Sequence, residues 1–231
     1  MIELSNLRFR WSATHAPVID IPRFSVKEGE RVFLEGPSGS GKTTMLNLLG
    51  GMTVPEQGSI VVDGIDLVGL KQAARDSFRA NRVGFIFQMF NLIPYLSLID
   101  IVMLPCRFST CRAEAACKKS GSVEADARRL LDHMEIDLEA LENRAVTALS
   151  TGQQQRVAAA RSLIGAPSLV IADEPTSALD QNVRDAFMSL LFSEITDAGA
   201  TLLFVSHDVT LASKFDRQTT MSDINNAGTQ Q

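Results

Sequence analysis

The feature that most constrains this chain is an octapeptide of the pattern G-x-x-x-x-G-K-[ST], set between an apolar run and a helix-like segment. It occupies residues 36–43 and reads Gly36-Pro37-Ser38-Gly39-Ser40-Gly41-Lys42-Thr43. Residues 31–35 before it are typical of a buried strand, and residues 44–49 after it favour a helix. A strand, a glycine-rich loop and a helix in this order predict a phosphate-binding loop (P-loop), and with it an α/β fold.

The chemistry of the octapeptide predicts a nucleoside triphosphate held with Mg²⁺. Its glycines let successive backbone N–H groups turn toward phosphate oxygens, and the new helix adds its positive N-terminal end. Lys42 is expected to reach the β- and γ-phosphates, and the Thr43 hydroxyl to ligate Mg²⁺. The predicted nucleotide-binding stretch extends to Thr44. The P-loop alone leaves kinases, GTPases and motors open.

A second motif lies at residues 149–156 and reads Leu149-Ser150-Thr151-Gly152-Gln153-Gln154-Gln155-Arg156. Its S-x-x-Q spacing is that of a capping box, and residues 156–163 after it have a helical pattern. Ser150 is expected to cap a helix whose positive end faces outward as an anion site. An ordinary capped surface helix is the alternative that this segment leaves open.

Two further apolar runs end in chemically useful side chains. Residues 168–174 read as a strand that ends in Asp173 and Glu174, a Walker B arrangement. Asp173 is expected to hold Mg²⁺ through its water shell, and Glu174 to polarise the attacking water as general base. A strand over 201–205 leads to His207, for which a hydrogen bond to the γ-phosphate is favoured over a purely structural role.

Together these motifs resemble the ATP-binding cassette (ABC) ATPases, over nearly the whole chain. The resemblance implies a Walker A motif at 36–43, a Walker B motif at 169–174, a Q-loop glutamine at Gln88 and an H-loop histidine at His207. It implies that Gln88 is catalytic and joins Thr43 and Asp173 around Mg²⁺. It also implies a signature motif of Leu149, Ser150, Thr151, Gly152 and Gln153, and a D-loop of Ser177, Ala178, Leu179 and Asp180.

The resemblance implies an α/β architecture with three parts: a P-loop NTPase core with a mostly parallel sheet, an antiparallel β subdomain and a helical signature subdomain at about 90–165. One domain is expected over residues 1–221. The helical spacing of apolar residues over 123–134 agrees with the helical part. Residues 222–231 are polar and are expected to form a disordered tail.

In this family two cassettes pack head to tail, with each ATP between the Walker A motif of one and the signature motif of the other. The chain carries one of each, so a second copy is the expected partner. Residues 83–97 and 63–67 resemble the branch that serves lipoprotein release, macrolide export and the FtsE type, whose permeases are FtsX-like. The expected place is the cytoplasmic face of the inner membrane. An importer ATPase, a soluble ABC ATPase and a module that scarcely hydrolyses ATP remain alternatives.

The sequence departs from the family's pattern at several points. Trp11 stands where a tyrosine usually stacks on adenine; stacking is favoured, and core filling is the alternative. Thr151 replaces a glycine, which would cost roughly 1–2 kcal/mol if that position needed a left-handed backbone. Residues 106–122 match nothing in the branch.

The net charge and the cysteine and histidine side chains outside the motifs indicate no further function. The net charge of −5 gives no electrostatic reason to bind nucleic acid. Cys106, Cys111 and Cys117 lack zinc-like spacing and are read as free thiols of a reducing cytosol, with a redox role for the last two as an alternative. His133 has no evident partner and is read as a surface residue.

Overall fold

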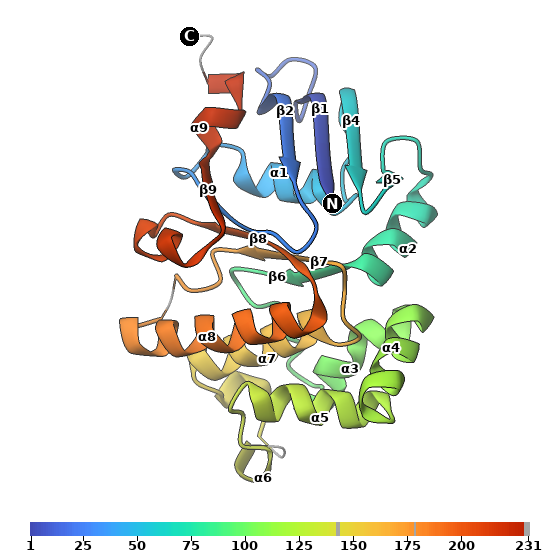
Figure 1. Ribbon diagram of the computed structural model, residues 1–231, viewed down its shortest axis with the longest axis vertical. Coiled ribbons are helices and arrows are strands. Elements are labelled where there is room, and N and C mark those ends of the chain that lie inside the picture. The colour runs from blue at the N-terminus through green and yellow to red at the C-terminus, as the bar shows by residue number, and fades with distance from the viewer. Residues whose placement is uncertain (142–143, 178, 229–231) are drawn as a thin grey trace. The chain divides into compact units, whose positions relative to one another are not determined.

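The computed structural model of the protein describes residues 1–141, 144–177 and 179–228 (Figure 1). By its internal contacts the chain divides into two compact units. The first unit comprises residues 1–79 and the chain from residue 201 onward, and the second unit comprises residues 80–200. Among the described residues, no helix is both apolar enough and long enough to cross a membrane.

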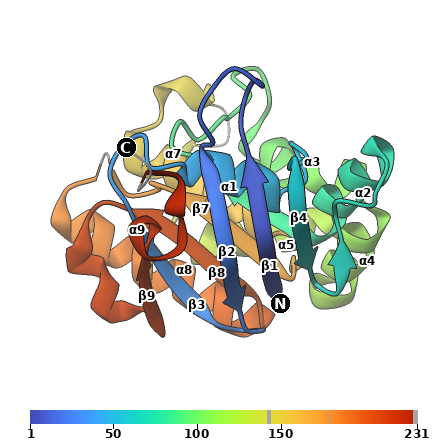
Figure 2. The same cartoon turned by 90° about the horizontal axis from the view of Figure 1, so that it is seen from above.

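The first unit contains an antiparallel sheet with the strand order β2-β1-β4-β5, and a separate set of parallel strands (Figure 2). In the parallel set, β3 pairs with β8 on one side and with β9 on the other. The elements of this unit are β1 (Ile2–Phe9), β2 (Ile19–Val26), β3 (Arg31–Glu35), α1 (Lys42–Leu49), β4 (Gln57–Val62), β5 (Ile65–Asp66), most of α2 (Gln72–Arg82), β8 (Thr201–Ser206), the 3-10 helix η2 (Val209–Lys214), β9 (Arg217–Thr220), α9 (Met221–Ile224) and η3 (Asn226–Gly228).

The burial patterns of these strands follow from their sequences. In β1, Ile2 and Leu4 are buried while Glu3 between them is exposed, which is the alternation of a sheet with one face to solvent. In β3, Val32 and Phe33 are both fully buried and so lie on opposite faces of a strand covered on both sides. The predicted strand before the octapeptide is therefore a core strand.

The second unit pairs two parallel strands, β6 and β7, and is otherwise helical. Its elements are β6 (Val83–Ile86), α3 (Leu98–Phe108), α4 (Thr110–Ser120), α5 (Val123–His133), α6 (Leu138–Leu141), η1 (Val146–Ala148), α7 (Thr151–Leu163), β7 (Leu169–Asp173) and α8 (Gln181–Ala198). The apolar spacing over 123–134 forms α5, and every described element from residue 98 to residue 163 is helical. The parallel strands, the antiparallel sheet and these helices confirm the predicted α/β P-loop fold class.

The segment 106–122, which the sequence left unassigned, forms the end of α3 and all of α4. Arg112 of α4 is 3% exposed and donates hydrogen bonds to the carbonyl oxygens of Ser162 (2.6 Å) and Ile164 (2.8 Å). Burial lowers the pKa of Arg112 to about 10 and raises that of Cys106 to about 11, so Arg112 is charged at neutral pH and Cys106 is a thiol. The segment thus satisfies two backbone carbonyls at the end of α7.

A buried carboxylate, Glu194 on α8, joins α8 to α5 and α4. Its oxygens accept hydrogen bonds from Arg129 of α5 at 2.7 and 3.4 Å, contact Nδ1 of His133, and lie 3.9 Å from Nζ of Lys119. His133 therefore has a partner, contrary to the sequence interpretation. Burial by itself would raise the pKa of Glu194, but the bonds from Arg129 and His133 outweigh it and leave the pKa lowered.

The chain beyond residue 221 differs from the expected disordered tail over residues 222–228. Residues 221–224 form the turn α9, which begins with a capping box between Thr220 and Asp223. The side chain of Asn225 is hydrogen-bonded to backbone groups of residues 18, 20 and 40. Polar composition suggested disorder, but these polar groups satisfy backbone groups instead. Residues 229–231 of the expected tail lie outside the described residues.

We predict that Glu194→Gln lowers the free energy of unfolding by about 2 kcal/mol at neutral pH, because the partly buried Arg129 loses one of its two carboxylate partners and keeps only Asp126. The folded-state pKa of Glu194 is lowered, so its contribution exists above the ordinary value of 4.5 and is lost as the pH falls through the folded-state pKa. The deficit should therefore shrink in urea titrations at acidic pH. Glu124→Gln, at an exposed pair with Arg128, is the control and should change little. An equal deficit in both variants would contradict the prediction.

Candidate functional site

The P-loop leaves the carboxyl end of β3 and ends where α1 begins at Lys42, as the sequence predicted. Gly39 and Gly41 have φ angles of 83° and 97°, in the region that side chains rarely allow. Gly36 is needed for a different reason, since a Cβ there would lie 2.7 Å from Oγ of Ser40 and 3.0 Å from Cγ of Met221. The loop is therefore closely packed as well as strongly curved.

The Lys42 side chain folds back over its own loop. Its Nζ donates hydrogen bonds to the carbonyl oxygens of Gly36 and of Pro37, the latter at 3.0 Å. The ammonium charge is thus held at the loop, where the backbone N–H groups and the start of α1 also favour an anion. The arrangement suits phosphate.

His207 leaves the same sheet edge as the P-loop. In the parallel pairing of β3 with β8, Glu35 is opposite Ser206. Gly36 follows Glu35 and His207 follows Ser206, so the P-loop and the His207 loop start at neighbouring carboxyl ends of the sheet. The first unit thus brings the phosphate loop and the predicted γ-phosphate contact to one edge.

The second unit has an equivalent edge. In the parallel pairing of β6 with β7, Ile86 is opposite Ala172, so Gln88 and the two acids Asp173 and Glu174 follow neighbouring strand ends. Glu174 is 9% exposed and has a φ of 48°, a left-handed conformation that costs a glutamate of order 1 kcal/mol. The Glu174 carboxylate is nearly buried and its backbone is strained. Neither property is expected if the two acids only formed a solvated turn.

The signature segment begins α7 with the predicted capping box. Oγ of Ser150 accepts from the N–H of Gln153 at 3.3 Å, and Oε1 of Gln153 accepts from the N–H of Ser150 at 2.9 Å. Ser150 and Thr151 are exposed, so this positive helix end faces solvent. Thr151 is the first helical residue and does not have a positive φ, so the strain considered for it is not present.

Two contacts in the second unit were missed at the sequence level. Arg161, in the last turn of α7, donates to the carbonyl oxygens of Phe90 (2.7 Å) and Asn91 (2.6 Å), both left-handed residues that follow Gln88 closely. Burial lowers its pKa. The signature helix and the Q-loop are thus joined directly. The only sequence signal was an arginine on an otherwise apolar helix face.

In the D-loop, the Asp180 carboxylate caps α8 by accepting from the N–H of Val183 at 3.1 Å. The Asx residue just before an amphipathic stripe was a recognisable cap signal. Ser177 donates its N–H to the carbonyl oxygen of Glu174 at 3.3 Å, which continues the turn that follows β7. Ala178, a predicted D-loop residue, lies outside the described residues.

Trp11 is 59% exposed, which excludes the alternative that it fills the core. Its ring meets Phe9 edge-on, with the centroids 5.0 Å apart and the planes at 86°. The exposed indole ring is therefore accessible to a ligand. Stacking on adenine stays a prediction.

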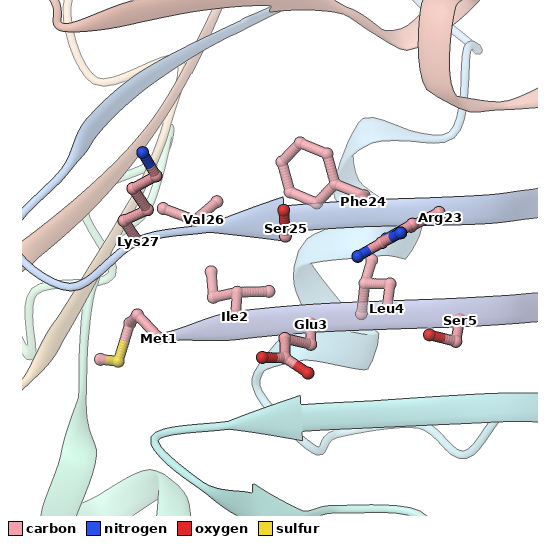
Figure 3. Close-up of a pocket in the computed structure, with 10 residues that line it drawn as sticks. All are labelled: Met1, Ile2, Glu3, Leu4, Ser5, Arg23, Phe24, Ser25, Val26 and Lys27. Atoms are coloured by element: carbon pink, nitrogen blue, oxygen red, sulfur yellow. The ribbon is translucent and has the colours of Figure 1, made fainter.

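A pocket of about 320 Å³ lies over β1 and β2 in the first unit (Figure 3). It includes charged side chains of both signs, Glu3, Arg23 and Lys27, and hydroxyls from Ser5 and Ser25. None of the residues predicted to bind ATP lines it. The pocket is therefore separate from the phosphate-binding features.

Comparisons with known proteins agree with the motifs. The model of the ABC transporter family matches residues 19–177. The lipoprotein-releasing system ATP-binding protein LolD of Syntrophotalea carbinolica is 38% identical over 96% of this chain and 95% of its own length. LolD of Anaeromyxobacter dehalogenans is 39% identical over 94% and 88%. A dimeric post-hydrolysis structure of the cassette MJ0796 of Methanocaldococcus jannaschii, bound to ADP and Pi, has a TM-score of 0.83 and 33% identity, and covers 98% of this chain and 95% of its own.

Because Thr151 already has a right-handed helical backbone, we predict that Thr151→Gly does not raise ATP turnover. Glycine relieves no strain there and disfavours the helix instead. Steady-state phosphate release by the two proteins, normalised to folded protein, measures the effect. Ser150→Ala is the companion variant and should lower stability by about 1 kcal/mol through loss of the cap. A clear rise in turnover for Thr151→Gly would show that this residue becomes strained during the reaction.

Proposed function

The chain belongs to the ABC transporter ATP-binding proteins and hydrolyses ATP, and from that premise we propose that two copies close around two MgATP to drive an FtsX-like membrane permease. The observation that carries the proposal is the placement of the motifs at parallel strand ends. The P-loop and His207 share one edge, and Gln88 shares another with Asp173 and Glu174. The groups at the first edge suit phosphate binding, and the acids at the second edge suit activation of water.

We propose that the first edge binds the phosphates. The N–H groups of the P-loop and the ammonium of Lys42 hold the β- and γ-phosphates, while His207 donates a hydrogen bond to the γ-phosphate. Trp11 stacks on adenine, and its exposed ring suits that role. Phosphoryl transfer depends on positioning and charge stabilisation, and these groups provide both.

We propose that the second edge supplies the proton acceptor. The Glu174 carboxylate takes a proton from water as the water oxygen attacks the γ-phosphorus, and ADP leaves. Thr43, Gln88 and Asp173 would each offer Mg²⁺ an oxygen atom, the kind of ligand that this ion prefers. Mg²⁺ would neutralise charge on the phosphate oxygens. The left-handed backbone of Glu174, with a φ of 48°, is the kind of strained conformation that clusters at active sites.

The second copy follows from the exposed signature helix. Ser150 and Thr151 present the positive end of α7 to solvent, where it suits the γ-phosphate of an ATP held by another chain. One chain has one P-loop and one signature segment, so two ATP require two chains. The two bonds from Arg161 to Phe90 and Asn91 link that helix to the segment that follows Gln88.

The permease partner is supported by the LolD relatives and by exposed apolar side chains near the Q-loop. Met89 is 81% exposed and Tyr95 is 86% exposed, and both follow Gln88 within seven residues. Such side chains suit a contact with the cytoplasmic part of a membrane protein. The protein would then act at the cytoplasmic face of the inner membrane, in lipoprotein release, export or transmission of force to the other side.

We predict that Glu174→Gln binds MgATP, hydrolyses it at least ~100-fold more slowly, and accumulates as a dimer that needs ATP. Glutamine fills the same volume but takes up no proton. Size-exclusion chromatography with and without MgATP, together with phosphate release, measures both effects. Lys42→Ala is the control and should stay monomeric through loss of nucleotide binding. A monomeric Glu174→Gln at saturating MgATP would contradict the two-copy sandwich.

We predict that Glu174→Gln purified from its native cells in mild detergent with MgATP retains a permease of about four spans and a large extracytoplasmic domain. Adding Tyr95→Ser should lower the recovery, because the apolar contact is lost. Val209→Ser, at a residue that is also exposed but lies in the first unit, is the matched control and should leave recovery intact. A substrate-conducting permease would favour an importer, and soluble partners alone would favour a non-transport role.

A further inference from the structure

Asn225, just after α9, makes three hydrogen bonds to backbone groups far away in the sequence. Its Oδ1 accepts from the N–H of Asp20 at 2.7 Å. Its Nδ2 donates to the carbonyl oxygen of Val18 at 3.0 Å and to that of Ser40 at 3.2 Å. The last of these belongs to the P-loop. One amide therefore joins the end of the described chain, the start of β2 and the phosphate loop.

The neighbouring part of α9 packs against the same loop. The Met221 side chain lies so close to Gly36 that a Cβ at residue 36 would be 3.0 Å from its Cγ. A Cβ at Gly41 would be 3.4 Å from Nδ2 of Asn225. Figure 2 shows α9 beside β2, with which it is in contact. All these residues belong to the first unit, and the P-loop is thus contacted near both ends.

The bond to Ser40 fixes the orientation of one peptide group of the P-loop. In a trans peptide the C=O of Ser40 and the N–H of Gly41 point in opposite directions. Holding the carbonyl oxygen toward Asn225 therefore turns the N–H of Gly41 away from it. Gly41 has a φ of 97°, and a glycine can adopt many backbone conformations. A hydrogen bond from outside the loop therefore restricts the rotation of this peptide group.

We propose that Asn225 is a positioning residue for ATP, which holds the Ser40–Gly41 peptide so that the loop N–H groups face phosphate. The amide is suited to this by its neutrality, because it donates to Ser40 without placing negative charge beside an anion site. Its bonds to Val18 and Asp20 anchor it at the start of β2, the strand that follows the Trp11 segment. The inference rests on ATP binding by the P-loop and not on the permease.

The test compares the Michaelis constant (KM) and turnover number (kcat) for ATP in the full chain and in Asn225→Ala. Loss of the bonds should raise KM about tenfold and leave kcat nearly unchanged in the folded fraction. A merely structural role would lower the amount of active protein without changing KM. Ser222→Ala is the control, since it removes from α9 a hydroxyl that contacts Thr220 and should not change KM.

Asn225→Asp covers the case in which the alanine variant does not fold. Aspartate keeps the volume and the acceptor for the N–H of Asp20, but lacks the two donated bonds. Its KM should be raised and should stay raised at high salt, which screens the added charge. An unchanged KM in a folded variant, or a rise that vanishes with salt, would overturn the proposal. Failure of the unmodified chain to bind ATP would instead contradict the proposed function.

Discussion

The parallel pairing of strands is the constraint on which the functional residues depend. It places the carboxyl ends of neighbouring strands at one edge, so short loops from distant sequence segments meet there. Glu35 opposite Ser206, and Ile86 opposite Ala172, set the relative positions of the loops that follow. A shift of either register would separate these residues even if every motif were intact.

The features that could be predicted from the sequence are those that depend on residues close together in the chain. The P-loop between β3 and α1 and the capping box at Ser150 were readable because glycine conformations and cap bonds involve residues within a few positions. The sequence could not say whether Thr151 needs a left-handed backbone. The structure shows that it does not, so Thr151 is not strained. Expected roles such as that of Trp11 came from resemblance and stay predictions.

Contacts between distant segments could not be predicted from one sequence. Arg161 bonds to residues 90 and 91, and Asn225 bonds to residues 18, 20 and 40. Both side chains satisfy backbone groups of distant segments, and such demands arise only after the chain has folded. Polar composition at the end of the chain therefore suggested disorder where the polar side chains had structural partners.

The folded-back Lys42 has a consequence for the energetics of ligand binding. Its ammonium already bridges the carbonyl oxygens of Gly36 and Pro37, so the curved loop is held by its own side chain. When phosphate binds, Lys42 exchanges its bonds to the loop carbonyls for bonds to phosphate. The loop is already ordered, so its conformational entropy is not lost again on binding. Binding is then expected to need little rearrangement of the backbone.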